Sequence, residues 1–224
     1  MKSIDWSLKV ANPEAFGEAE KEQWVRVQPI LTEVLDELWE ADKIETVYEP
    51  AEKRAFLSCI QKVDDFGAVH NALLHLSDSR EKASSFQDAT SRFGFDEPKI
   101  TANYILVAFS LAVLKIELFK LVLLFHMKDV DEPNVSNFGV TMRNAAPSSW
   151  PKLRPLVDSP LRNALAHGTY MFAGKKIVLF QDAKLKPMRE MDLAGFIMRA
   201  KAQDVLLQCL VNLLREKGFY ALDL

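Results

Sequence analysis

The stretch YILVAFSLAVLKIELFKLVLLF (residues 104–125) decides the fold, because it is the most hydrophobic part of the chain. Its length approaches that of a membrane span. However, Lys115, Glu117 and Lys120 lie near its middle, and each charge would be costly in hydrocarbon. A helix that is apolar nearly all round is typical of the centre of a helical bundle or of a dimer. The sequence therefore predicts a buried central helix and no membrane insertion.

An amphipathic segment on the N-terminal side predicts another helix over residues 18–39. Pro29 falls inside this segment, so the helix either begins near it or is kinked there. Six apolar side chains recur at helical spacing and should form the buried face: Trp24, Val27, Leu31, Val34, Leu35 and Leu38.

Two more helices are expected in the N-terminal half, one following Pro50 and one over residues 66–76. The stretch 77–98 is polar and rich in Ser, Asp and Arg, which is consistent with a loop or a weak helix. We therefore expect an acidic helical N-terminal region over residues 1–95 and a helical domain over residues 96–224.

The C-terminal side adds shorter elements. A helix is expected over residues 136–145, and Ser149 is suited to cap a brief one that follows. Residues 170–172 and 177–180 are apolar and flank a glycine, which is typical of a small hairpin. Asp192 is placed to cap a last apolar helix. The predicted fold is an all-α bundle with one small β-hairpin and extra N-terminal helices.

Composition is ordinary for a globular protein: 224 residues, 49% hydrophobic and 26% charged. Residues 1–16 lack the apolar core of a signal peptide. Cys59 and Cys209 are far apart and lie in helix-like surroundings, so reduced, structural thiols and a cytoplasmic location are expected. No phosphate loop, dinucleotide fingerprint or nucleophile elbow is present, and His70 and His75 have no neighbouring Cys or acidic cluster. We expect neither a cofactor nor a metal.

Charge is unevenly distributed along the chain. Residues 1–65 carry 8 Lys/Arg against 15 Asp/Glu, whereas residues 141–190 carry 9 Lys/Arg against 3 Asp/Glu. Attraction to phosphate would be concentrated in the second block, although a solvated basic surface explains the same counts.

The basic block contains the stretch DSPLRNALAHGTY (residues 158–170), which predicts a short helix with clear ends. Asp158 or Ser159 suits the N-cap, and Gly168 suits the residue past the C-terminus. Asn163 and His167 are four residues apart and share a face, where the amide can orient the imidazole. Arg162 lies about 140° round the helix from His167, so only its long side chain reaches the same ligand.

The residue types in this helix suit phosphodiester cleavage, since they combine an arginine fork with a side chain of the type that titrates near neutral pH. A structural alternative is that His167 only stabilises the C-terminal end of its helix.

Arg162-Asn163-x-x-x-His167, followed by Gly168 and an aromatic residue, resembles the Arg-x4–6-His signature of the HEPN superfamily (higher eukaryotes and prokaryotes nucleotide-binding domains). The resemblance covers roughly the C-terminal half. It implies an all-helical, usually dimeric fold. Many members are metal-independent endoribonucleases, often toxins or phage-defence factors, and others serve only as binding modules.

The resemblance also implies roles for individual residues. His167 would act as general acid or base on RNA, Arg162 would hold the scissile phosphate, and Asn163 would orient the imidazole or bind phosphate. Glu117 and Lys120 would assist from the long apolar helix, or else form an intrahelical ion pair. Further substrate-binding residues are expected among Lys152, Arg154, Tyr170, Lys175 and Lys176.

A homodimer would supply two Arg/His pairs to one composite site. Two other functions remain open from the sequence. One is a catalytically silent module that binds RNA, a nucleotide or a protein. The other is a subunit whose acidic N-terminal half recruits or masks a partner, such as an antitoxin.

Overall fold

The computed structural model describes residues 16–44, 98–128, 130, 137–173, 176–181 and 186–217. For residues 98–111, Phe172 and Gln181 it describes the backbone only. The helices predicted after Pro50 and over residues 66–76 lie outside the described residues, as do Cys59, His70, His75 and the boundary near residue 95.

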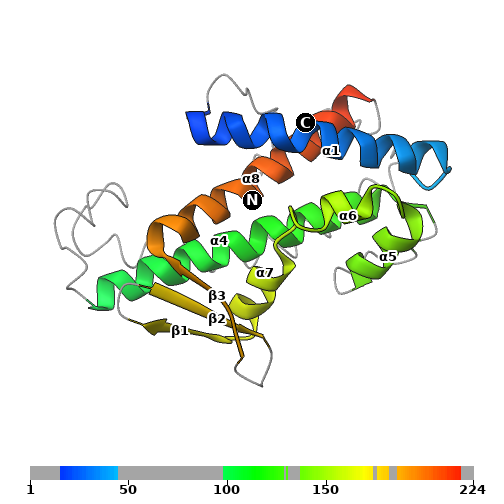
Figure 1. The fold of residues 1–224 in the computed structure, drawn as a ribbon. Coiled ribbons are helices and arrows are strands. Elements are labelled where there is room, and N and C mark those ends of the chain that lie inside the picture. The colour runs from blue at the N-terminus through cyan, green and yellow to red at the C-terminus, as the bar shows by residue number, and fades with distance from the viewer. Residues whose placement is uncertain are drawn as a thin grey trace, which may run out of the picture. The chain divides into compact units, whose positions relative to one another are not determined.

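The described elements are α1 (Glu18–Glu40), α4 (Pro98–Phe125), α5 (Phe138–Ala145), α6 (Trp150–Leu153), α7 (Ser159–Ala166), β1 (Tyr170–Ala173), β2 (Lys176–Gln181), β3 (Lys186–Asp192) and α8 (Leu193–Glu216) (Figure 1). They belong to two compact units. Unit 1 includes α1, residues 115–159 and residues 201–217, and unit 2 includes residues 98–114 and 160–200. Helices α4 and α8 each contribute to both units.

Helix α1 confirms the prediction from the sequence. It begins before Pro29, which lies inside it. At its N-terminus the Glu20 carboxylate accepts a hydrogen bond from the Gly17 N–H at 2.9 Å, which satisfies a backbone donor that the helix leaves unpaired. Its buried residues are the six that the apolar spacing predicted: Trp24, Val27, Leu31, Val34, Leu35 and Leu38.

The core of unit 1 forms where α1, α5, α6 and the C-terminal parts of α4 and α8 bury their apolar side chains together. Ile116 and Phe119 of α4 are almost completely buried, as predicted for the central helix. Phe138 of α5 packs edge-on against Phe119 and Trp150, with ring centroids 6.2 and 5.8 Å apart. Within the described part of the chain, no helix is long and apolar enough to cross a membrane.

Unit 2 contains a three-stranded antiparallel sheet in the order β1-β2-β3. The predicted hairpin is present as β1 and β2, but the prediction of a hairpin alone was wrong, because β3 adds a third strand. The sequence of β3, KPMREMD, carries a proline and four charges and so has little apolar alternation. The segment forms a strand because its backbone pairs with β2, although its own sequence has no clear strand pattern.

Helix α7 and β2 pack together in the second core. Leu161, Ala164 and Leu165 of α7 are buried with Ile177 and Leu179 of the sheet. At the end of β3, the Asp192 carboxylate accepts a hydrogen bond from the Gly195 N–H at 2.7 Å. Asp192 therefore caps α8 as predicted.

Candidate functional site

Helix α7 carries the Arg162/His167 motif and ends in a backbone cap. The Thr169 N–H donates to the Ala164 carbonyl at 2.9 Å, and the Gly168 N–H donates to the Leu165 carbonyl at 3.4 Å. Gly168 has a φ of 66°, which is the left-handed conformation that this cap requires. The sequence predicted this glycine correctly. The Asn163, Ala164 and Leu165 carbonyls thus each accept a backbone N–H, and the Thr169 hydroxyl adds a second bond to the Ala164 carbonyl at 3.5 Å.

The start of α7 is held by a side chain of α8. The Gln203 amide accepts a hydrogen bond from the Asp158 N–H at 3.3 Å and donates one to the Leu156 carbonyl at 3.0 Å. Gln203 and Asp158 are both buried. These bonds fix the segment that leads into the motif, and no feature of the local sequence around Asp158 pointed to Gln203.

His167 directly follows the last residue of α7 and is exposed. Its backbone N–H donates to the Asn163 carbonyl at 3.0 Å. Because Gly168 and Thr169 already close the helix, the imidazole stays available to a ligand.

Arg162 and Asn163 contact each other on the same helix. The Arg162 guanidinium donates from Nη1 to Oδ1 of Asn163 at 3.1 Å. Since Asn163 and His167 share a face, this bond draws the guanidinium round toward the side that carries the imidazole. Asn163 thus acts on Arg162 in this structure, whereas an orienting contact with His167 stays a prediction.

The remaining residues predicted for substrate binding in unit 2 differ in their surroundings. Tyr170 is half-buried and packs against the second core. Lys176 is exposed but pairs with Glu190 on the neighbouring strand, and this hydrogen bond raises the pKa of the lysine. The positive charge of Lys176 is therefore partly neutralised by Glu190 within the sheet. Lys175 lies outside the described residues.

Four other residues predicted for the site belong to unit 1. Lys120 lies 3.5 Å from Glu117, and both side chains are largely buried. This is the intrahelical ion pair given above as the alternative to a role in the site. Lys152 pairs with Glu33 at 2.5 Å, and Arg154 is exposed just after α6. A contribution of these four residues to the Arg162/His167 site stays a prediction.

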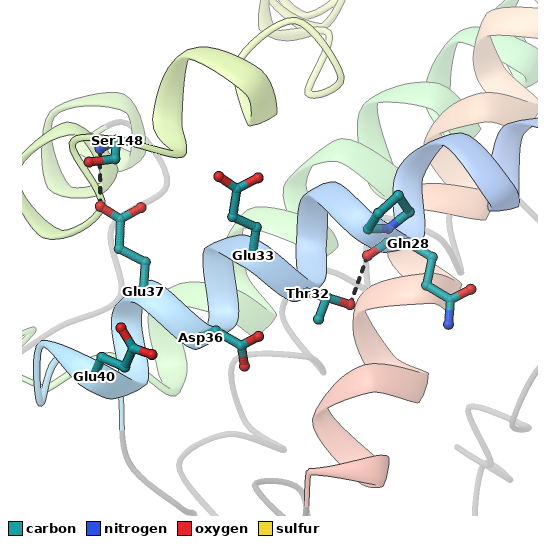
Figure 2. A pocket seen from close by; sticks show the side chains of 8 residues that line it. Gln28, Thr32, Glu33, Asp36, Glu37, Glu40 and Ser148 are labelled. Atoms are coloured by element: carbon teal, nitrogen blue, oxygen red, sulfur yellow. Dashed lines mark hydrogen bonds between the residues drawn. The ribbon is translucent and has the colours of Figure 1, made fainter.

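Unit 1 also carries a groove of about 810 Å³ along the polar face of α1 (Figure 2). Four carboxylates, those of Glu33, Asp36, Glu37 and Glu40, line it together with Ser148. The sequence analysis gave the acidic N-terminal half as a surface that recruits or masks a partner, and a partner for this groove stays a prediction. Its other lining residues are Gln28, Pro29 and Thr32.

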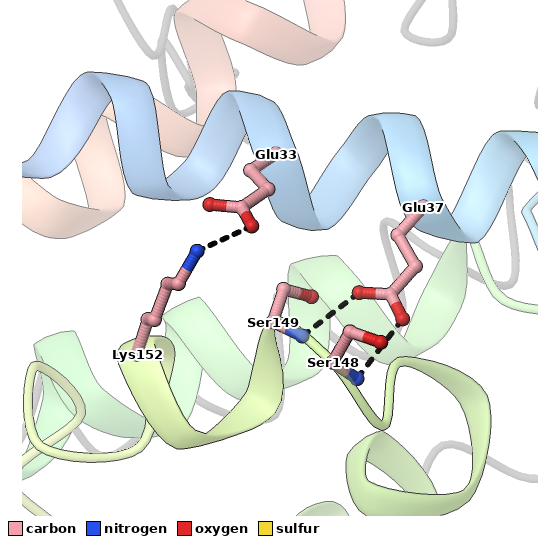
Figure 3. Close-up of polar contacts among 5 residues, drawn as sticks. All are labelled: Glu33, Glu37, Ser148, Ser149 and Lys152. Carbon is pink, nitrogen blue, oxygen red and sulfur yellow. Dashed lines mark hydrogen bonds and ion pairs between the residues drawn. The ribbon is translucent and has the colours of Figure 1, made fainter.

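Most of these carboxylates already bind groups of the protein. Glu37 accepts hydrogen bonds from the Ser148 and Ser149 N–H groups at 3.0 and 2.9 Å (Figure 3). Glu33 pairs with Lys152, and Asp36 pairs with Lys217. The acidic face of α1 therefore ties this helix to α6 and to the end of α8. The local sequence showed that α1 carries these carboxylates, but it did not show which groups they bind.

The prediction that Ser149 caps α6 was wrong, and Glu37 instead binds the two backbone N–H groups that directly precede this helix. Ser149 does precede α6, but its side chain makes no capping hydrogen bond. Burial alone would raise the pKa of Glu37, yet the hydrogen bonds from Ser149 and Ser148 outweigh burial and lower it. The carboxylate is thus held in its charged form at the start of α6, where the helix dipole favours a negative charge.

Other titratable groups are placed in structural roles. His126 is fully buried just after the end of α4, with Nδ1 2.8 Å from the carbonyl of Val122 in the last turn of that helix. Burial raises the pKa of the Cys209 thiol to about 12. Among the described residues, no group of three or more His, Cys, Asp or Glu side chains is arranged to hold a metal ion.

The known proteins give no family for this chain. Comparison with protein-family models, with curated proteins and with solved structures finds no match.

Proposed function

We propose that the chain is a metal-independent endoribonuclease of the HEPN type, with Arg162 and His167 as its catalytic residues. The observation that carries the proposal is the exposed imidazole at the C-terminal end of α7, where backbone hydrogen bonds already cap the helix. A histidine that is not needed as a cap is available for chemistry. Arg162 supports the same reading, because Asn163 holds its guanidinium toward the imidazole side.

The reaction uses the RNA itself as nucleophile. The 2′-oxygen attacks the neighbouring phosphorus while its proton moves to a neutral imidazole. The bond from phosphorus to the 5′-oxygen breaks, and a protonated imidazole supplies the proton to the leaving oxygen. Arg162 stabilises the charge that develops on the phosphate oxygens. The products are a 2′,3′-cyclic phosphate and a 5′-hydroxyl.

One imidazole per chain provides either the base or the acid at a given moment. A two-fold dimer that brings two α7 helices together supplies both. We therefore include a homodimer in the proposal, with a toxin or defence role as its biological context.

Purified protein incubated with total RNA in EDTA tests the proposal. Wild type is expected to release fragments with 5′-hydroxyl ends, and His167→Ala and Arg162→Ala are each expected to lose most of this activity. The double variant should lose little more, because the two residues act as one unit. Arg143→Ala is the matched control, since it removes an exposed arginine from the end of another helix, α5.

Two results would contradict the proposal in different ways. If His167→Ala sharply lowered the melting temperature and left cleavage intact, the histidine would be a structural residue. If wild type bound RNA without cleaving it, the chain would be a silent binding module, which is the second reading of the motif.

A further inference from the structure

One buried side chain, the amide of Gln203 on α8, binds both sides of the turn that leads into the motif helix. Its oxygen accepts a hydrogen bond from the Asp158 N–H at 3.3 Å, and its nitrogen donates one to the Leu156 carbonyl at 3.0 Å. The amide thus offers an acceptor and a donor to backbone groups two residues apart. Gln203, Asp158 and Leu156 are all buried, so these backbone groups depend on the protein rather than on water for their hydrogen bonds.

The turn is also closed by its own backbone. The Leu156 and Val157 N–H groups both donate to the Leu153 carbonyl, at 2.9 and 3.3 Å, and the Ser159 N–H donates to the Val157 carbonyl at 2.6 Å. Gln203 adds two bonds from outside the turn, to residues 45 and 47 positions away along the chain. The conformation from which α7 starts is therefore set by local hydrogen bonds together with one distant amide.

Helix α7 needs a fixed start because it has only eight residues. A helix of about two turns is marginal in water unless the rest of the fold holds it. Its C-terminal end is held by the left-handed Gly168 and the backbone bonds of that cap. Arg162 belongs to the opposite end, as the fourth residue of the helix. Loss of the Gln203 bonds would therefore loosen the Arg162 end, while the His167 end keeps its cap.

We infer that Gln203 is a positioning residue for Arg162. Its amide fixes the first turn of α7, and this turn holds the guanidinium where it stabilises charge on the reacting phosphate. Gln203 acts through the helix and not through contact with RNA, so its effect on the reaction passes through Arg162 and not through His167. The inference rests on the proposed function, in which Arg162 acts on the phosphate.

Hydrogen exchange followed by NMR tests the positioning without RNA. Gln203→Met replaces the amide by an apolar side chain of similar length. The Arg162 and Asn163 amides should then exchange at least about 10-fold faster, because two hydrogen bonds that hold the start of α7 are lost. The His167 amide, at the capped end of the helix, should keep its wild-type rate.

Gln208→Met is the matched control, since Gln208 is half-buried on the same helix and its amide binds Asp204 of that helix. It removes the same group from α8 without changing the turn before α7, so exchange and cleavage should stay near wild type. Gln203→Asn serves if Gln203→Met fails to fold. It keeps an amide but is one CH₂ group shorter and cannot make both bonds, so it should give the same exchange pattern with a smaller change.

The link to Arg162 is tested by cleavage of RNA in EDTA. Gln203→Met should lower kcat about 10-fold with little change in KM, because Arg162 acts on charge that develops in the transition state. Combined with Arg162→Ala, the same substitution should change the remaining activity less than about 2-fold, since the group that it positions is gone. The pH dependence of cleavage should stay that of wild type, because the imidazole is not disturbed.

Wild-type exchange rates at Arg162 and Asn163 in both Gln203 variants would overturn the inference. So would a loss of activity that is as large in the Arg162→Ala background as in wild type, because Gln203 would then only stabilise the fold. If wild type released no RNA fragments, the proposed function would be wrong whatever the exchange rates, and the role of Gln203 in that reaction would fall with it.

Discussion

Replacing Glu37 by glutamine should destabilise unit 1, because this carboxylate accepts two backbone N–H bonds at the start of α6. Hydrogen bonds to a charged group contribute about 1.5–3 kcal/mol each when buried. Glu37 is half-exposed and an amide oxygen can still accept one bond, so we expect the free energy of unfolding to fall by about 1 kcal/mol. In a chain of this size that lowers the melting temperature by about 2–4 °C.

The matched control is Glu40→Gln, since Glu40 lies one turn further along α1, lines the same groove and is exposed. It removes the same charge without weakening these two backbone hydrogen bonds and should leave stability nearly unchanged. Urea denaturation of wild type, Glu37→Gln and Glu40→Gln at pH 7 would measure the three free energies of unfolding. Equal effects of the two substitutions would refute the reasoning.

The effect of Glu37→Gln should also depend on pH. The pKa of Glu37 is lower in the folded chain than its ordinary value, so the carboxylate stabilises the fold fully above the pKa of the unfolded state. That contribution disappears as the pH falls through the folded pKa. The difference in stability between wild type and Glu37→Gln should therefore shrink at acidic pH. A difference that stays constant down to pH 3 would contradict a role of the charge.

Three further predictions follow from described residues. Gly168→Ala should lower the free energy of unfolding by about 1 kcal/mol, because the φ of 66° at this position is left-handed. Gly168→Asn should lower it by less, and thermal melting of both variants would compare them. Cys209, whose pKa is raised to about 12 by burial, should resist iodoacetamide at pH 8 in the folded chain and react at once in urea. Light scattering should show a homodimer, and a monomer at high micromolar concentration would count against a composite Arg162/His167 site.

The local sequence was sufficient to predict those features that depend on residues only a few positions apart. The buried face of α1 followed from apolar spacing, because a helix repeats every 3.6 residues whatever it packs against. Gly168 and Asp192 were recognisable as helix ends, since only certain residues satisfy the backbone groups there. The exposed position of His167 follows from the same cap.

Contacts between distant parts of the chain could be seen only in the tertiary structure. Strand β3 looks polar on its own and exists through pairing with β2. Glu37 is 111 residues from Ser148, and Gln203 is 45 residues from Asp158. The pairing of Leu179 with Arg189 depends on strand register and on an irregularity between Leu179 and Phe180. Register and side-chain partners are decided by what packs together across the fold, and that information is absent from any short window of sequence.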